Sequence, residues 1–200
     1  MSSVLILRHG ESTWNVEHRW QGWLDAPLSE AGEMQAAVRG RTLRRDGFKP
    51  RAIYTSDLGR AARTAEILAA HVGAPVIREQ GFRERNGGEW QGHTGAEIDG
   101  RWPGQRAAWR RGELSAPPGG ETDGQTLVRF DTALTRALAH VGPSLLMIVT
   151  HHGMLRAVAT RAGADVDALI PNLGGFWFDV VDGALADPTP VDSPISEELL

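Results

Sequence analysis

The chain alternates short, continuous apolar runs with longer segments in which apolar residues recur every three or four positions. A continuous apolar run predicts a strand that is buried on both faces, and the longer spacing predicts a helix with one apolar face. The predicted strands are residues 4–7, 52–55, 76–79, 145–150 and 176–181. The predicted helices are residues 29–45, 58–71, 127–141 and 154–162.

Strands that are apolar throughout and separated by helices indicate an α/β fold. We expect a three-layer sandwich, with a mainly parallel central sheet flanked by helices. Residues 87–124 break the alternation because they are rich in glycine and tryptophan, and they predict an irregular lid insertion. We expect a single domain over residues 1–186. The proline-containing residues 187–200 predict a loosely held C-terminal extension.

The composition excludes several classes of protein. The 200 residues carry a formal net charge of −4, which gives no indication of nucleic-acid binding. The chain has no cysteine, so it has no disulfide, thiolate nucleophile or cysteine-based metal site. The first apolar run soon meets Arg8 and is too short for a signal-peptide core or a membrane span. We therefore expect a soluble cytoplasmic protein that does not associate with membranes.

Arginine and histidine follow three of the predicted strands. Arg8, His9 and Gly10 follow the first strand, His151 follows the fourth, and Arg60 lies just after the second. Because ligands in open α/β sheets gather beyond the carboxyl ends of the strands, we expect these residues to share one edge of the sheet.

These residue types suit a phosphoryl group. Arginine offers a planar fork of donors that matches phosphate oxygens, and a neutral histidine nitrogen is able to attack phosphorus. Gly10 would let the backbone approach the anion closely. Each residue alone has a plainer explanation, as a cap or a surface charge. A metal site at His9 and His151 is the rival use, but no further ligands complete a set at recognisable spacing, so we predict no metal.

Five segments resemble the motifs of the histidine phosphatase superfamily, in the branch of cofactor-dependent phosphoglycerate mutases and bacterial broad-range phosphatases. The resemblance runs in the family order from about residue 4 to residue 178. The segments are RHGESTWN at 8–15, QGWLD with LSEAG at 21–32, YTSDLGRAARTA at 54–65, FRERNGGEWQG at 82–92 and VTHHGMLRA at 149–157.

The resemblance implies a role for each matching catalytic position. His9 corresponds to the nucleophile, and Arg8, Arg60 and His151 correspond to the residues that hold the phosphoryl oxygens. Glu84 corresponds to the proton donor, which protonates the leaving oxygen and then activates water. From the residues alone, Glu84 reads as a solvated loop charge between two arginines.

Further positions correspond to phosphate or substrate contacts. They include His152, at a position where the family usually has a small residue, so the resemblance leaves the size of the leaving group and the pH optimum open. They also include the pair Arg110 and Arg111, which resembles the mutase segment whose two arginines hold a substrate carboxylate. The plainer alternative is that this pair is an exposed basic helix end. These positions are Gly10, Asn15, Gln21, Gly22, His152, Arg110 and Arg111.

Phosphatases and mutases of this kind share the phosphohistidine and differ in what accepts the phosphoryl group. The compact region before His151, with residues 118–122, resembles the phosphatases, so we predict a phosphomonoesterase acting on small phosphorylated metabolites without a cofactor. The alternative is a 2,3-bisphosphoglycerate-dependent phosphoglycerate mutase, and the third is a non-catalytic module that binds phosphorylated ligands. The seven tryptophans allow a homodimer interface, although packing around the loop after His9 explains several of them.

Overall fold

One six-stranded sheet organises the computed structural model, which describes residues 2–166 and 169–193. The strand order is β3-β2-β4-β1-β5-β6; the first four of these strands run parallel to one another, and β5 is antiparallel to both of its neighbours. The expected α/β fold with a mainly parallel central sheet is confirmed. The strands are β1 (Ser2–Arg8), β2 (Ala52–Thr55), β3 (Val76–Arg78), β4 (Leu146–Thr150), β5 (Gly175–Val181) and β6 (Ala184–Val191).

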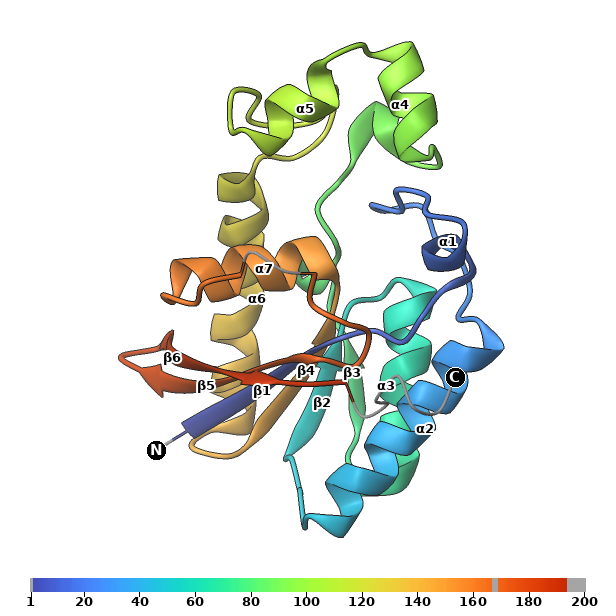
Figure 1. Cartoon of the computed structure of the whole chain (residues 1–200). Helices are drawn as coiled ribbons and strands as arrows, with labels where there is room; N and C mark the ends of the chain where they lie inside the picture. Colours follow the sequence, from blue (N-terminus) through green and yellow to red (C-terminus); the bar gives the residue numbers. More distant parts are fainter. Residues whose placement is uncertain (1, 167–168, 194–200) are drawn as a thin grey trace.

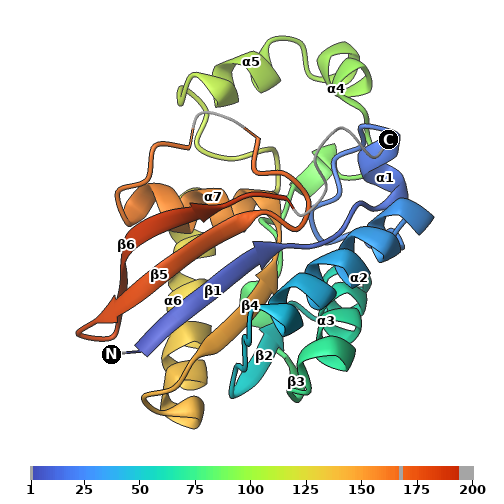
Figure 2. The same cartoon turned by 60° about the horizontal axis from the view of Figure 1, so that its bottom comes forward.

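Helices cover both faces of the sheet (Figures 1 and 2). The pair α2 (Glu30–Arg45) and α3 (Gly59–Val72) lies on one face, and the pair α6 (Asp123–Val141) and α7 (His152–Arg161) lies on the other. The structure therefore has the predicted three layers. Within the described ranges, no helix is long and apolar enough to cross a bilayer.

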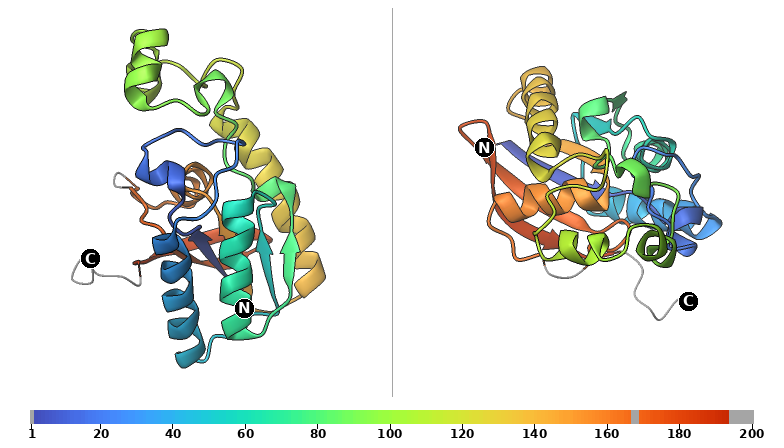
Figure 3. Two further views of the ribbon diagram at one scale, coloured as in Figure 1. Left: turned by 90° about the vertical axis from the view of Figure 1, so that its right-hand side faces the viewer. Right: turned by 90° about the horizontal axis from the view of Figure 1, so that it is seen from above.

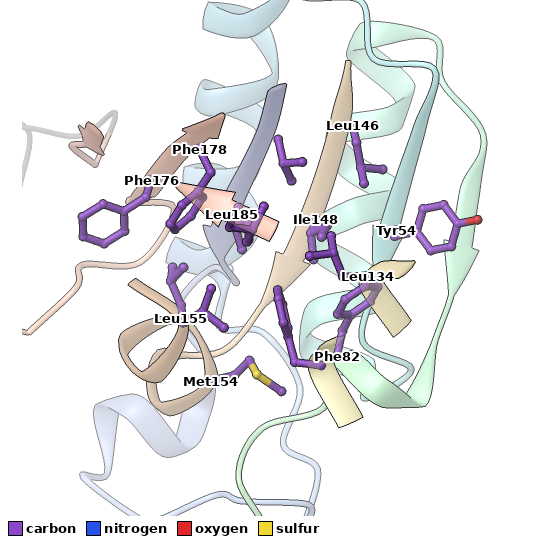
Figure 4. Packing of buried hydrophobic residues seen from close by; sticks show 14 of the residues in the cluster. Tyr54, Phe82, Leu134, Leu146, Ile148, Met154, Leu155, Phe176, Phe178 and Leu185 are labelled. Carbon is purple, nitrogen blue, oxygen red and sulfur yellow. The ribbon is translucent and has the colours of Figure 1, made fainter. Parts of the chain in front are cut away.

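The apolar strands serve two cores at once because successive side chains point to opposite faces. In β1, Val4 and Ile6 pack toward α6 and α7, whereas Leu5 and Leu7 pack toward α2 and α3. In β4, Ile148 joins the same core as Val4, as Figure 4 shows for the side with α7. A strand buried on both faces needs apolar residues at every position, which is why these runs are continuous.

Capping residues set the helix boundaries. The predicted helix at 127–141 begins earlier, at Asp123, because Thr122 accepts from the Gln125 backbone N–H and the Gln125 side chain accepts from the Thr122 backbone N–H. At the other end of a helix, Gly73 adopts φ 73° and closes α3. The helix predicted at 154–162 starts at His152, with His151 as the residue before its first turn.

The C-terminal prediction differs from the structure. The boundary at 186/187 falls inside β6, which pairs with β5 through Val191. The prolines at 188 and 190 are tolerated because β6 is an edge strand, where a missing N–H need not break the ladder. Residues 194–200 of the predicted extension lie outside the described residues.

The predicted lid region, residues 87–124, carries two short helices, α4 (Gly95–Arg101) and α5 (Gln105–Arg110), which stand apart from the sheet (Figures 1 and 3). The 3-10 turn η2 (Gly88–Trp90) leads into it, and the short helix α1 (Thr13–Val16) lies beside it. Trp20, from the loop after α1, packs edge-on against Trp90 at 5.1 Å and Trp109 at 5.2 Å between ring centroids. This aromatic cluster ties the lid to the segment that follows His9.

We predict that Phe130→Ala destabilises the protein by about 3–5 kcal/mol, because it deletes a large buried side chain and leaves a cavity. Phe130 is fully buried on α6 and its ring packs against Phe82 at 5.5 Å. The measurement is the free energy of unfolding in urea. Val128→Ala is the matched control, since Val128 is 68% exposed on the same helix and its loss is expected to change stability by less than about 0.5 kcal/mol. Equal effects of the two changes would contradict this description of the core.

Candidate active site

The ends of β1, β4 and β2 meet at one edge of the sheet. Arg8 is paired with Thr150 in the parallel register, and the backbone N–H of His9 donates to the Thr150 carbonyl at 2.9 Å. The N–H of Ser56, at the end of β2, donates to the Val149 carbonyl at 3.1 Å. As a result the rings of His9 and His151 lie 5.1 Å apart between centroids, at an interplanar angle of 63°. The structure brings these predicted site residues together.

The hydrogen bonding of His9 defines its tautomer. Its Nδ1 lies 2.6 Å from the carbonyl oxygen of Gly10. Because a carbonyl oxygen only accepts, Nδ1 carries the proton and Nε2 keeps a lone pair. Burial lowers the pKa of His9 well below 6.5, and the charges of Arg60 and Arg8 lower it further. His9 therefore presents a neutral nitrogen nucleophile.

His151 and His152 are neutral for the same reasons. His151 is fully buried, and neither of its ring nitrogens has a hydrogen-bond partner among the described residues. Burial lowers the pKa of His151 well below 6.5, with Arg60 adding to the effect. Burial also lowers the pKa of His152 to about 4, followed by the charge of Arg8. Both imidazoles are free to hydrogen-bond a ligand without adding positive charge.

Arg8 and Arg60 are buried cations held largely by backbone carbonyls. Arg8 Nη1 donates to the Ile170 carbonyl at 2.7 Å, and Arg60 Nη2 donates to the Gly22 carbonyl at 2.8 Å. Arg60 also meets the half-exposed Asp25 carboxylate at 3.2 Å. Burial lowers the pKa of Arg8 to about 10, so it stays charged at neutral pH. The Nε of each arginine is buried without a partner in the described chain.

Glu84 reaches the same place from a loop. Its carboxylate accepts from the backbone N–H of Arg85 at 2.8 Å, Gly153 at 3.0 Å and Met154 at 2.9 Å. The last two donors belong to the first turn of α7, directly after His151 and His152. The negative charge of Glu84 also acts to raise the pKa of Arg8, against the larger lowering by burial. Glu84 is thus not the solvated loop charge that its neighbours alone suggest.

The segment after His9 is folded onto Arg60. Asn15 Oδ1 accepts from the Ser12 backbone N–H at 3.0 Å, which caps α1, and the Ser12 hydroxyl lies 3.0 Å from Gln21 Oε1. Gly22 adopts φ 52°, and its carbonyl accepts from Arg60. Asn15, Gln21 and Gly22 therefore shape the loop beside the buried arginine.

The packing around Gly10 explains why this position is a glycine. Its backbone N–H donates to Thr64 Oγ1 at 3.0 Å. A Cβ at this position would lie 2.6 Å from the Gly32 carbonyl oxygen. The close approach of the β1 end to the start of α2 therefore requires the glycine by itself, and the expected contact between Gly10 and an anion stays a prediction.

The two lid arginines diverge. Arg110 lines a cavity beneath the lid, whereas Arg111 directs Nε and Nη2 to the Glu113 carboxylate at 2.7 and 2.8 Å. The Arg111 side chain is 59% exposed in this surface pair. Arg110 and Arg111 thus point to different places in this structure, and Arg111 is not among the residues that line the cavity; the expectation that both hold one ligand stays a prediction.

Residues just before β5 support the site and were not among the sequence candidates. Asn172 Nδ2 donates to the His9 carbonyl at 2.9 Å. The backbone N–H of Leu173 donates to the Arg8 carbonyl at 3.1 Å, and Leu173 is a buried residue held at φ 58°. A non-glycine residue in this region carries strain of about 1–3 kcal/mol, which the surroundings must hold in place. The proline, asparagine and glycines at 171–175 predict a loop, but the sequence does not indicate that this loop packs against Arg8 and His9.

Taken together, these residues offer a neutral imidazole nitrogen with a free lone pair, two buried guanidinium groups, further neutral imidazoles and a carboxyl group. Such a set suits a group with several negatively charged oxygens, because preorganised donors stabilise charge that develops during transfer. Within the described part of the chain, no group of three or more histidine, aspartate or glutamate side chains is arranged to hold a metal ion.

Comparison with known proteins gives consistent matches along most of the chain. The model of the histidine phosphatase superfamily (branch 1) matches residues 4–170. The 2,3-bisphosphoglycerate-dependent phosphoglycerate mutase of Methylobacterium radiotolerans is 34% identical over 179 residues, which cover 85% of this chain and 83% of that protein. The glucosyl-3-phosphoglycerate phosphatase of Mycolicibacterium vanbaalenii is 35% identical over an alignment of 205 positions, which covers 94% of this chain and 87% of that protein.

A solved structure supports the same grouping. The mycobacterial glucosyl-3-phosphoglycerate phosphatase in complex with VO3 superposes with a TM-score of 0.82 at 30% identity. The match covers 96% of this chain and 99% of that one. The fold and the sequence motifs therefore point in one direction.

We predict that the free protein loses stability as the pH falls below about 6.5, the ordinary pKa of histidine. Because the pKa values of His9, His151 and His152 are lowered in the folded state, the unfolded chain binds protons below pH 6.5 that the folded chain does not. Stability then rises with pH across this window, by about 1.4 kcal/mol per pH unit for each such histidine. Urea unfolding at pH 7, 6 and 5 measures the slope.

His152→Gln provides the matched comparison, since it removes one of the three groups. Between pH 6 and pH 5, the free energy of unfolding of this variant is expected to change with pH by about 1.4 kcal/mol per pH unit less than that of the parent chain, because one proton fewer is taken up on unfolding. An identical slope in the two proteins would show that His152 is not neutral in the folded state.

Proposed function

The chain belongs to the histidine phosphatase superfamily, and we propose that it hydrolyses small phosphorylated metabolites through a phosphohistidine on His9. The observation that carries this proposal is the fixed tautomer of His9. The Nδ1–H donates to the Gly10 carbonyl, so the lone pair of Nε2 is available to attack phosphorus. No described residue hydrogen-bonds to Nε2.

In the proposed first step, Nε2 forms a bond to phosphorus while the bond from phosphorus to the ester oxygen breaks. Arg8 and Arg60 offer guanidinium N–H groups to the phosphoryl oxygens, and His151 offers a ring nitrogen. Glu84 in its protonated form gives its proton to the departing oxygen. Since these donors are already in place before the ester binds, little reorganisation is needed as charge develops.

In the proposed second step, water attacks the phosphorus of the phosphohistidine. Glu84, now a carboxylate, takes a proton from the water as the P–N bond breaks, and His9 returns to its neutral form. The products are inorganic phosphate and free enzyme, and Glu84 is again protonated. The same carboxyl group serves as acid and then as base, as in other double-displacement reactions.

The relatives are named for two activities, phosphatase and mutase, and the mutase activity is our second candidate for this protein. A phosphoglycerate mutase would return the phosphoryl group to a bound phosphoglycerate and exclude water from the phosphohistidine. The 34% identity to the Methylobacterium mutase supports this second activity. The compact segment between Glu84 and His151 and the match to phosphatases over nearly the whole chain favour hydrolysis.

A cavity of about 720 Å³ lies beneath the lid, and we take it as the place of the leaving group. It lies between the lid, the start of α6 and α7, and its lining includes Arg85, Arg110 and Arg156. Arg85 pairs with Asp123, whereas Arg110 and Arg156 form no salt bridge with any described residue. Two of these arginines connect the cavity with the proposed site along the chain: Arg85 directly follows Glu84, and Arg156 lies one helical turn after His152 on α7.

We propose that the substrate carries a carboxylate in addition to its phosphate. Unpaired guanidinium groups bind carboxylates well because the two planar groups match in geometry. The glucosyl-3-phosphoglycerate phosphatases among the relatives are named for an ester of this kind, and a phosphorylated sugar acid or small acid would fit here too. We place the enzyme in the cytoplasm, since multiply charged esters do not cross membranes unaided.

We predict that His9→Ala lowers kcat/KM by about 10³-fold or more and abolishes acid-labile phosphate labelling of the protein, because the covalent nucleophile is lost. His18→Asn is the control: His18 is exposed at φ 54°, a conformation that asparagine tolerates.

A second measurement, on the parent enzyme, separates hydrolysis from isomerisation. Free phosphate and 2-phosphoglycerate are measured from 3-phosphoglycerate, with and without 2,3-bisphosphoglycerate. Release of phosphate should exceed isomerisation in both mixtures. Faster isomerisation would establish the mutase instead.

We predict that Arg110→Gln or Arg156→Gln lowers kcat/KM for 3-phosphoglycerate by about tenfold or more, which is the usual worth of a charged hydrogen bond. For glycerol 3-phosphate, which has a hydroxymethyl group in place of the carboxylate, the change should stay within about threefold. Arg111→Gln is the matched control because its guanidinium pairs with Glu113 at the surface. Equal losses on the two substrates would remove the carboxylate from the proposal.

A further inference from the structure

Arg129, on α6, binds the backbone of the loop that carries Glu84. Its Nη1 donates to the carbonyls of Gly81 at 3.0 Å and Arg83 at 2.6 Å. Its Nη2 donates to the carbonyl of Glu84 itself at 2.6 Å. One guanidinium therefore contacts three carbonyls within four residues, and these fix the path of the chain up to Glu84.

Glu121 completes the attachment from the other side. Its carboxylate accepts from Arg129 Nε and Nη2, each at 2.9 Å, and its Oε2 also accepts from the Asn86 backbone N–H at 2.8 Å. The ion pair is largely buried, with the side chains of Arg129 and Glu121 exposed by 19% and 18%. The pair thus holds the backbone both before and after Glu84.

Trp23 adds a further contact at the same carbonyl. Its Nε1–H donates to the Glu84 carbonyl at 2.7 Å, and its ring lies 5.9 Å from the Arg129 guanidinium carbon. With its carbonyl bound twice and its carboxylate bound by the first turn of α7, Glu84 is fixed at both ends. By contrast, every hydrogen bond of Arg129 goes to residues 81–84 or to Glu121, and none goes to Arg8, His9, Arg60 or His151.

We propose that Arg129 is a positioning residue for the proton donor. It sets the location of the Glu84 carboxyl group relative to the leaving oxygen and takes no part in the attack of His9 on phosphorus. This inference rests on the proposed role of Glu84 in hydrolysis. It requires the fork of the arginine, because one lysine ammonium cannot reach three carbonyls and a carboxylate in one plane.

The dependence of rate on the leaving group separates this role from a general effect on the fold. A p-nitrophenolate leaves without a proton, whereas the alkoxide of glycerol 3-phosphate needs one. The value of kcat/KM reports the steps up to the release of the first product, so it excludes hydrolysis of the phosphohistidine. The informative quantity is therefore the ratio of kcat/KM for glycerol 3-phosphate to kcat/KM for p-nitrophenyl phosphate.

In Arg129→Lys and Arg129→Gln we expect this ratio to fall by about tenfold or more, since a small misplacement of a proton donor costs that much. The value for p-nitrophenyl phosphate should change by less than about threefold. The lysine variant retains the positive charge, which in the parent chain contributes to the lowered pKa of His151. A normal ratio in a folded Arg129→Lys would overturn the proposal and leave only an effect of charge.

Arg136→Gln is the matched control, because Arg136 lies on the same helix in an exposed pair with Glu79 at 3.2 Å and should leave the ratio unchanged. Thermal unfolding reports whether each variant is folded. If neither Arg129 variant folds, Glu121→Gln decides: a lowered ratio supports the proposal, and an unchanged ratio overturns it.

Glu84→Gln distinguishes failure of this inference from failure of the proposed function. A selective loss on glycerol 3-phosphate in Glu84→Gln, without one in Arg129→Lys, rejects the positioning role alone. An equal loss on both substrates in Glu84→Gln rejects Glu84 as the proton donor, and the role of Arg129 is rejected with it.

Discussion

Burial of two arginines beside neutral histidines is the constraint on which the site depends. A buried charge costs several kcal/mol unless other groups compensate for it. In this protein the compensation comes largely from carbonyl dipoles, such as that of Ile170 for Arg8 and that of Gly22 for Arg60. Carbonyls support a guanidinium without neutralising it, so the positive charge remains for an anion. The same positive charge, together with burial, keeps the imidazole of His9 neutral and therefore nucleophilic.

This constraint explains the loops around the sheet. The strand ends supply Arg8 and His9, but carbonyls that face them must come from elsewhere in the chain. The loop before β5 folds back so that Ile170 and Asn172 bind these two residues, and it holds Leu173 in a left-handed conformation. Local strain of this kind persists where the surrounding structure determines the backbone. The cost in stability falls on the residues that hold the site, as is common at functional positions.

The sequence predicts part of this arrangement and misses another part for a physical reason. Arg8, His9 and His151 follow directly from strand periodicity, because parallel strands end at one edge. Glu84 is identified only by family resemblance, since its partners in α7 lie about 70 residues away and no local pattern indicates the contact. Arg129 has no local signal at all: on a helix it resembles any polar-face arginine until the loop at 81–84 is placed. Element boundaries fail where capping outweighs apolar spacing, as at the start of α6.

The site has to provide both chemistry on phosphorus and selectivity for the rest of the substrate. Of the groups proposed to act on phosphorus, Arg8, His9 and His151 lie at strand ends, Arg60 lies in the first turn of α3, and Glu84 lies on a loop held by α7. Arg110, by contrast, lies on the short lid helix α5. His152 lies at the start of α7, where burial lowers its pKa and keeps it neutral, so it adds no further charge to these cations. A substrate with a phosphate and a carboxylate at opposite ends would satisfy the phosphoryl site and the cavity arginines at once. A substrate lacking the carboxylate would leave Arg110 and Arg156 to water, so these two arginines, and not the phosphoryl site, would give the enzyme its selectivity.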